Sequence, residues 1–325
     1  MSREHVGHAD IATFAEERVN LRKADAVDLR AQANRLRDRL TNYVSEHPDF
    51  ALRKLILSGS LAKGTALKST SDIDLACYVS AATAPGQIAD LVAWLATRLE
   101  TAFANLKPEQ IQRKTYSVSI TFAGTGNEID IVPILYAGDP DWRGDLISQD
   151  DGSRLMTSVP LHLEFIRKRK TANPKHFAQV VRLVKYWAGR LKAEDPEFRF
   201  KSFMVELILA KLADEGLPLN DYPEALSGFF AYLATDALTS KIAFDDYYDP
   251  SRCAATADPV CIWDPVNCEN NVSRLYGETN RAGIVEAALD AGDAIDAATL
   301  RHHQGRDRPL LAEGSRPEFQ PVRPE

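Results

Sequence analysis

The feature that most constrains this chain is a pair of carboxylates at the start of an apolar strand. Asp72 and Asp74 introduce the apolar run Ile73–Val79, and another short apolar strand, Lys54–Ser58, comes before them. Residues two apart on a strand point to the same face, so the two carboxylates lie side by side. Like charges this close repel each other, which predicts a cation between them.

A third carboxylate, Asp130, stands in the segment EIDIVPILY, residues 128–136, which predicts another strand. Ile129 and Ile131 point to one face of that strand and Asp130 to the other. Oxygen ligands suit Mg²⁺, which usually binds one or two carboxylates together with substrate phosphates. Three carboxylates and two divalent ions about 3.5–4 Å apart would clamp a phosphate for in-line displacement. We therefore predict a Mg²⁺ site, which Mn²⁺ can also fill, formed by Asp130 and the first two aspartates.

The dipeptide Gly59-Ser60 ends the first strand, twelve residues before Asp72. Glycine lets the backbone approach a phosphate closely, and loop amides together with the Ser60 hydroxyl can donate hydrogen bonds to its oxygens. The following segment, LAKGTALKSTS, predicts a polar loop with further donors. A tight turn followed by aspartates that cap loops would explain either feature alone. Their combination with a third strand aspartate favours a site for phosphate and metal.

The first half of the chain alternates helices with strands. A four-three spacing of apolar residues predicts one long helix over residues 10–46, which we expect to pack along both halves of the protein. A second helix is predicted over 85–105. Alternation within TYSVSITFA, residues 115–123, predicts a half-buried strand, and the turn GTGN leads from it into the strand that carries Asp130.

The second half predicts helices. Asn173 and Pro174 are predicted to start a helix that continues through KHFAQVVRLVKYWAGRLK. The segment KSFMVELILAKLADEG predicts a second helix that stops at Gly216, and a third helix is predicted over 223–238.

The end of the chain is expected to be mixed. VCIWDPVNCENNV predicts a short strand followed by an Asx- and Pro-rich turn, in which Asp264 has a structural role. A last helix is predicted over 279–300, and the residues beyond His303 are predicted to form a mobile tail.

Composition excludes several classes of protein. The 325 residues are 45% hydrophobic and 26% charged, as in ordinary globular proteins, and the net charge of -7 disfavours a general nucleic-acid binder. We expect no membrane span, because the best apolar run, SFMVELILAKLA, is interrupted by Glu206. The four cysteines form no CxxC pair, which argues against a zinc site and indicates a reduced, cytoplasmic setting.

Two sets of motifs carry a resemblance to a known family. GSLAKGTALKSTSDIDL with EIDIVP resembles the polymerase-β-like nucleotidyltransferase superfamily, and VVRLVKYWAGRLK, KSFMVELIL and IWDPVNCENNVS resemble the helical half of 2′-5′ oligoadenylate synthetases. The bacterial relatives with both are the cGAS/DncV-like nucleotidyltransferases (CD-NTases), which make cyclic oligonucleotide signals in antiphage (CBASS) defence. The resemblance implies an α+β, bilobal fold: a catalytic lobe with a long N-terminal helix over 1–155, a helical lobe over 156–303 and a flexible tail over 304–325.

The resemblance also implies roles for individual residues. Asp72, Asp74 and Asp130 match the catalytic, metal-binding triad of the family, with Asp130 nearest the attacking hydroxyl. Gly59 and Ser60 match the turn that holds the phosphates.

Three further matches lie in the helical half. The resemblance implies that Lys185 reaches the donor triphosphate, that Ser202 contacts it and that the ring of Phe203 stacks on the donor base. From the residues alone, Lys185 lies at the edge of an apolar helix face, where it either projects into a cleft or snorkels at the surface.

A basic segment also needs an interpretation. Residues 167–192 contain nine Lys or Arg and no Asp or Glu. They form a solvated helix end, a surface that neutralises incoming triphosphates, or a binding site for nucleic acid or an acidic partner. The acidic overall charge and the lack of a zinc-ligand insertion favour an enzyme that needs no nucleic-acid activator. We expect a monomer that is active by itself or switched by a regulatory accessory protein.

The expected activity follows from these matches. The chain would condense NTPs, ATP among them, with release of pyrophosphate into a cyclic di- or trinucleotide. The alternatives are a linear oligoadenylate synthetase, a nucleotidyltransferase that modifies RNA or protein, and an inactive relative that only binds. The three intact aspartates count against the last alternative.

Overall fold

The computed structural model describes residues 5–47, 52–69, 72–81 and 90–299, and it has the α+β architecture that the sequence predicts. Its first half is built on a seven-stranded sheet with strand order β1-β2-β5-β4-β3, extended by β6 beside β5 and β7 beside β6. β2 and β5 run parallel, and the other paired strands run antiparallel. The strands are β1 Leu52–Ser58, β2 Asp72–Ser80, β3 Ile111–Arg113, β4 Val118–Thr121, β5 Glu128–Tyr136, β6 Gly144–Ile147 and β7 Arg154–Thr157.

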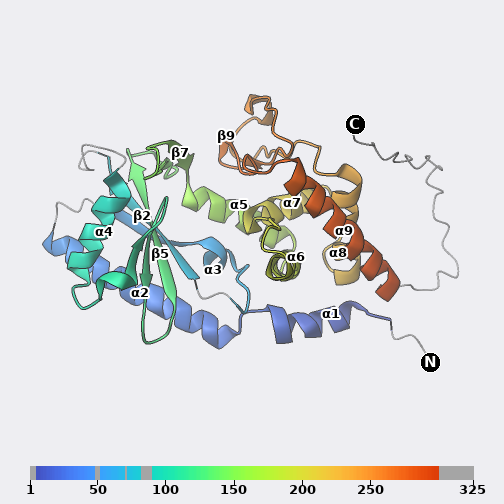
Figure 1. Ribbon diagram of the computed structural model, residues 1–325, viewed down its shortest axis with the longest axis horizontal. Coiled ribbons are helices and arrows are strands. Elements are labelled where there is room, and N and C mark those ends of the chain that lie inside the picture. Colours follow the sequence, from blue (N-terminus) through green and yellow to red (C-terminus); the bar gives the residue numbers. More distant parts are fainter. Residues whose placement is uncertain (1–4, 48–51, 70–71, 82–89, 300–325) are drawn as a thin grey trace, which may run out of the picture.

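One face of the sheet is covered by two helices, α2 (Lys23–Glu46) and α4 (Leu91–Ala102) (Figure 1). Ile73, Leu75 and Ile131 point into this layer and are at most 1% exposed. The aspartates between them point to the opposite face because strand side chains alternate with a period of two. The alternation therefore sorts the apolar residues into the core and leaves the carboxylates outside it, as the sequence predicts.

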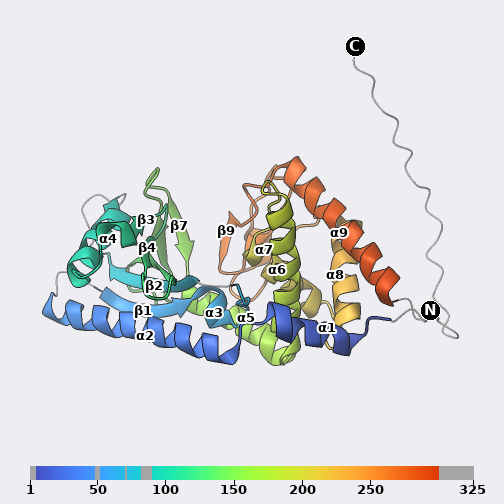
Figure 2. The ribbon, with the colours of Figure 1, turned by 60° about the horizontal axis from the view of Figure 1, so that its bottom comes forward.

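The second half is helical, with a short hairpin beside it (Figure 2). Helix α7 lies at its centre, and the side chains of 204–210 are at most 2% exposed. Burial on all sides explains why this helix is almost continuously apolar. The elements are α5 Val159–Ala172, α6 His176–Glu194, α7 Ser202–Asp214, α8 Tyr222–Asp236, β8 Trp263–Asp264, β9 Asn267–Asn271 and α9 Glu278–Thr299.

The prediction of one long N-terminal helix is wrong. Helix α1 (His8–Phe14) continues into a π-helical turn (Ala15–Val19), and the chain leaves the helix at Asn20 before α2 begins. The Asn20 side chain donates to Gln179 Oε1 on α6 at 2.9 Å, and Val19 O accepts the Lys68 amide at 2.8 Å. These contacts end the helix where the segment crosses from the helical half to the sheet. The N-terminal helical segment packs against the helical half and α2 packs against the sheet, so two helices replace the single one that was expected (Figure 2).

The predicted start of α6 is also wrong. Residues 159–172 form α5, which the sequence did not reveal, with Ser158 Oγ accepting from the Leu161 amide at its beginning. Asn173 therefore ends α5 and donates its amide to Arg169 O, and α6 starts after Lys175, which has a φ of 67°.

Other expectations differ in extent. Helix α4 ends at Ala102 rather than at 105, and its predicted first residues, up to 89, lie outside the described part of the chain, as does the tail over 304–325. The predicted polar loop after β1 contains a short helix, α3 (Gly59–Lys63). Among the described residues, no helix is long and apolar enough to cross a membrane.

Candidate active site

All eight site residues predicted from the sequence line one cavity of about 680 Å³, in which residues of the sheet half face residues of the helical half. The sheet half contributes the start of β2 and β5 together with α3, and the helical half contributes α6 and α7. The lining residues are Gly59, Ser60, Lys63, Leu67, Ser69, Asp72, Asp74, Asp130, Lys185, Lys192, Ser202, Phe203 and Glu206.

The parallel pairing of β2 and β5 brings the carboxylates together. Asp74 lies opposite Asp130 in the strand register, and Asp72 lies two residues before Asp74 on the same face. Burial raises the pKa of Asp74, and the Asp130 and Asp72 carboxylates raise it further. Lys63 and Lys114 lower it in part, so the net direction is a raised pKa.

One lysine already contacts this carboxylate group. Lys114, just after β3, donates from Nζ to both Asp130 oxygens at 2.9 and 3.0 Å. Within the described residues, no three His, Cys, Asp or Glu side chains stand together as a complete metal-ligand set. The carboxylate oxygens of Asp72 and Asp74, which lie on one face of β2, nevertheless fit a hard divalent cation.

Gly59 is required by its closeness to Asp74. Its φ is 62°, and a Cβ placed on it would lie 1.6 Å from Asp74 Oδ2. Any side chain at this position would push the carboxylate away, and the left-handed backbone adds strain for every residue except glycine. Gly59 therefore allows the first turn of α3, which carries Ser60, to lie directly against the aspartate.

The opposite wall of the cavity holds a buried carboxylate between two lysines. Glu206 on α7 is 2% exposed; Lys63 Nζ lies 2.7 Å from its Oε2, and Thr65 Oγ1 donates to its Oε1 at 2.8 Å. Lys185 Nζ lies 3.9 Å from the same carboxylate and donates to Thr65 O at 3.0 Å. Burial by itself would raise the pKa of Glu206, but the two lysines and the hydrogen bonds reverse this and lower it, so the carboxylate is ionised.

Lys185 therefore lies in the cavity wall and not at the open surface. Its side chain is 7% exposed, and burial lowers its pKa. The sequence left open whether Lys185 projects into a cleft or lies at the surface, and the structure places it in the cleft.

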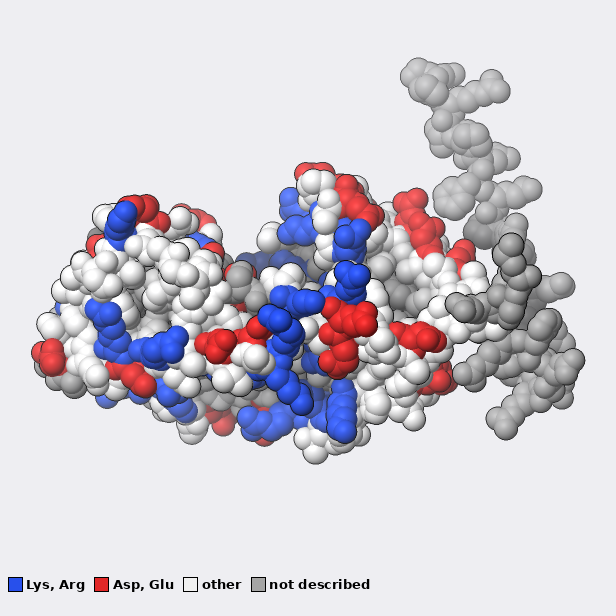
Figure 3. All heavy atoms as spheres, turned by 90° about the horizontal axis from the view of Figure 1, so that it is seen from below, with Lys and Arg blue, Asp and Glu red and all other residues white. Residues whose placement is uncertain are grey.

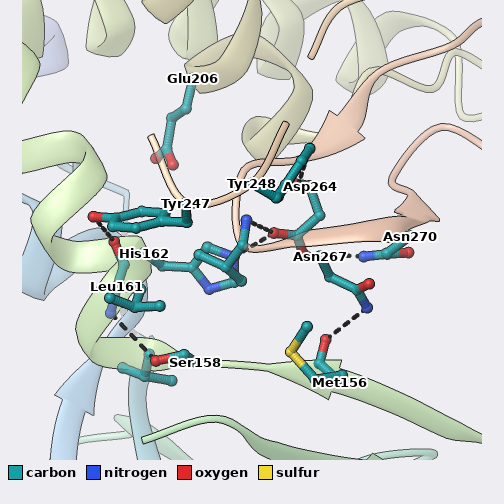
Figure 4. A network of polar contacts seen from close by, with 12 residues as sticks. Met156, Ser158, Leu161, His162, Glu206, Tyr247, Tyr248, Asp264, Asn267 and Asn270 are labelled. Atoms are coloured by element: carbon teal, nitrogen blue, oxygen red, sulfur yellow. Dashed lines mark hydrogen bonds and ion pairs between the residues drawn. The ribbon is translucent and has the colours of Figure 1, made fainter. Parts of the chain in front are cut away.

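Phe203 is held in place by two neighbours. Lys63 Nζ lies 4.7 Å from the centre of its ring, and the His162 ring meets it edge to face at 5.4 Å. His162 on α5 in turn contacts Asp264 Oδ1 at 2.7 Å (Figure 4). Asp264 also accepts from the Val266 amide, at 2.9 Å, so its role in the hairpin is structural, as expected.

The basic segment 167–192 is used in large part for internal contacts. Arg169 forms ion pairs with Asp214 and Asp246, and Arg182 donates to Gly64 O at 2.7 Å. Seen from below, basic side chains gather near the middle of the molecule with acidic side chains directly beside them (Figure 3). The segment thus joins the two halves as well as contributing Lys185 and Lys192 to the cavity.

Several lining residues were not predicted. Lys63 lies within the GSLAKGT motif, and Glu206 was noted only as a charge that interrupts an apolar helix. A lone carboxylate in an otherwise buried helix requires a cationic partner, and that requirement was the available signal. Lys114, which contacts Asp130 and is not among the lining residues, carried no comparable signal in the sequence.

The matches to known proteins agree with this cavity. Residues 37–143 match the family model described as "Nucleotidyltransferase domain". The cyclic AMP-AMP-AMP synthase of Escherichia coli (strain MS 115-1) is 58% identical over 298 residues, covering 92% of this chain and 93% of that protein. The CBASS oligonucleotide cyclase CdnC of Escherichia coli (strain KTE188) is 31% identical over 263 residues, covering 79% and 81%.

A solved structure of a relative has the same fold. The structure of E. coli MS115-1 CdnC in a HORMA-deltaN complex superposes with a TM-score of 0.84 at 56% identity, covering 91% of this chain and 92% of the other. Sheet, cavity and carboxylates together define a nucleotidyltransferase. The chain belongs to the CD-NTase family, the nucleotidyltransferases that make cyclic oligonucleotides.

Proposed function

We propose that this chain joins three ATP molecules into a cyclic AMP-AMP-AMP signal in CBASS defence, releasing one pyrophosphate for each bond formed. The observation that carries the proposal is the single cavity in which Asp72, Asp74 and Asp130 face Lys185 across the junction of the two halves. Carboxylates for metal and a lysine for phosphate are the two components that nucleotidyl transfer needs. The choice of adenine and of three units rests on the likeness to the E. coli synthase.

Asp72 and Asp74 would hold Mg²⁺, with Asp130 joining them when it turns from Lys114. When bound, the metal would lower the pKa of the attacking hydroxyl and neutralise charge on the phosphates. The raised pKa of Asp74 supports this assignment: burial is its largest cause, and repulsion from Asp130 and Asp72, which a cation would relieve, adds to it.

The remaining predicted residues would hold the donor nucleotide. Ser60 and Ser202 lie on the cavity wall, where their hydroxyls can donate to phosphate oxygens, and Lys185 supplies positive charge. Phe203 offers a ring face for the donor base, next to Lys63. We propose the same division as for the family: a catalytic lobe over 1–155 and a helical lobe over 156–303.

Regulation by an accessory protein is part of the proposal. The E. coli MS115-1 CdnC structure is a complex with HORMA-deltaN, and a comparable partner would switch this chain. The four cysteines are free, which is compatible with the reducing cytoplasm where NTPs are made.

The test is a product analysis. The protein, with and without its accessory protein, is incubated with labelled NTPs and Mg²⁺, treated with phosphatase, and the products are identified by mass spectrometry. A phosphatase-resistant product with the mass of three linked AMP units is expected. A linear product that loses its 5′ phosphates, or transfer of nucleotide to RNA or protein, would contradict the proposal.

A further inference from the structure

The cavity lining contains two lysines beyond the predicted Lys185, namely Lys63 and Lys192, and Lys63 is unusually well placed. Lys63 is the last residue of α3, on the same short helix as Ser60, and its side chain is 14% exposed. It lies near three groups of the cavity: the Phe203 ring, the Glu206 carboxylate and Asp74, whose charge it partly offsets. A lysine between the ring for the base and the aspartates for the metal stands where the phosphates of a nucleotide would lie.

Lys63 also has capacity for a further partner. Its ammonium carries three N–H donors, and the hydrogen bond that the described residues make with it goes to Glu206 Oε2. Glu206 itself is fully buried in the wall, so it can orient the ammonium without occupying the space of a ligand. Lys185 is tied to the same wall through Thr65.

We propose that Lys63 is a second lysine contact to the nucleotide triphosphate, and that Glu206 is a positioning residue that holds Lys63 and Lys185 aimed into the cavity. This inference rests on the proposed function and deepens it by adding two residues. Two ammonium groups placed close together repel each other, and a buried carboxylate between them offsets that repulsion. A buried charge with fixed partners also keeps long lysine side chains from taking other rotamers before the nucleotide arrives.

The first experiment compares Lys63→Met with Lys68→Met. Lys68 lies five residues later, is exposed and donates to the Glu17 backbone, outside the cavity lining, so it is a matched control for loss of one positive charge. Calorimetry measures binding of α,β-methylene ATP, whose Pα–Pβ bridge is not cleaved, and of AMP, both with Mg²⁺. We expect Lys63→Met to weaken triphosphate binding about tenfold or more and AMP binding less than twofold, with Lys68→Met unchanged.

The second experiment tests Glu206. Glu206→Gln keeps the size and one acceptor oxygen but removes the charge, so both lysines remain and are no longer fixed. We expect triphosphate affinity within threefold of the parent and kcat lower by about tenfold, because orientation matters most in the transition state. An equal kcat for Glu206→Gln and the parent would show that Glu206 does not position the lysines.

A purely structural role of the ion pair predicts a different pattern. If Lys63 only neutralised Glu206, Lys63→Met would lower thermal stability and leave the preference for triphosphate over AMP intact, which would overturn the proposal. If Glu206→Gln fails to fold, the comparison of triphosphate and AMP binding by Lys63→Met and Lys68→Met still tests the proposed Lys63 contact. The outcome is separate from the proposed function: if the parent protein makes no cyclic product but loses triphosphate binding with Lys63→Met, the proposed function fails and the Lys63 contact stands.

Discussion

Burial and electrostatic repulsion both act on the carboxyl group of Asp74. Burial first, then Asp130 and Asp72, raise the pKa of its carboxyl. A carboxyl whose pKa is higher in the folded than in the unfolded state stabilises the fold at low pH, and that contribution is lost as pH rises through the folded pKa. At neutral pH and without metal, the ionised Asp74 therefore destabilises the protein.

Asp74→Asn should separate stability from activity. We expect the melting temperature at pH 7 without metal to rise by about 2 °C, while nucleotide condensation falls by about a thousandfold or more. Differential scanning fluorimetry and mass spectrometry of the products measure the two effects. Asp38→Asn, an exposed aspartate on α2, is the control and should change neither. Ready product formation by Asp74→Asn would contradict the metal assignment.

Gly59 permits a sharper test, because the chain offers a second glycine with the same backbone strain. Gly126 has a φ of 69° and nothing within 4 Å of a Cβ, whereas a Cβ on Gly59 would collide with Asp74. Each change to Ala should cost about 1–2 kcal/mol of unfolding free energy through the left-handed backbone. Only Gly59→Ala should also lower kcat/KM, by about a hundredfold, because it displaces the carboxylate. Equal activity of the two variants would mean that the close approach has no catalytic importance.

At the scale of elements, the break between the π-helical turn and α2 depends on Asn20. This side chain is 7% exposed, exchanges hydrogen bonds with Gln179 in both directions and accepts from Arg182 Nε. Asn20→Ala removes the hydrogen-bond partner of these buried groups, which should lower the free energy of unfolding by about 1–3 kcal/mol. Urea unfolding should show that loss, and Thr41→Ala, whose hydroxyl donates to Arg37 O of its own helix, should remain near the parent. A change below about 0.5 kcal/mol for Asn20→Ala would contradict this account.

The β8–β9 hairpin is attached to α5 through Asp264. Burial would raise the pKa of this carboxyl, but His162, the Val266 amide and Asn270 outweigh it and hold the pKa below its usual range. A depressed pKa gives stability that is present above the unfolded value of about 3.9 and is lost as pH falls through the folded pKa. Asp264→Asn should therefore cost about 1–3 kcal/mol at pH 6, and the difference from the parent should shrink below about pH 4. Chemical unfolding at both pH values measures it, and a difference independent of pH would contradict the assignment.

At the scale of the whole molecule, the two large apolar clusters lie on opposite sides of the cavity. Polar contacts connect them there, among them Lys63 with Glu206 and Arg182 with Gly64. A nucleotide that touches both walls should therefore stabilise the junction itself. With Mg²⁺ and α,β-methylene ATP at about a hundred times the Kd, we expect about 2.7 kcal/mol of added stability. Scanning calorimetry should also show narrower unfolding with the nucleotide, because the two halves then unfold together; an unchanged profile would contradict a ligand that bridges them.

The sequence by itself determined the strands that carry the three aspartates and the face to which those aspartates point. Alternation in Ile73–Val79 and in 128–136 fixes which side chains are buried, because the period of two is a local property of the backbone. The Gly-Ser turn and the three aspartates therefore appeared in the right place, on the right face, before any contact was known. Lys185 could be assigned only through resemblance, because its helix face left both the surface and a cleft open.

Only the tertiary structure decided the contacts that cross between the halves. The N-terminal helix is broken by a hydrogen bond between Asn20 and Gln179, 159 residues apart, and no local pattern encodes that partner. Glu206 meets Lys63 across 143 residues, so the sequence showed a charge in a buried helix without showing what neutralises it. Periodicity acts within a few residues, whereas the partner of a buried polar group is chosen by how whole elements pack. For that reason the sequence determined the components of the site, and packing determined which cations they face.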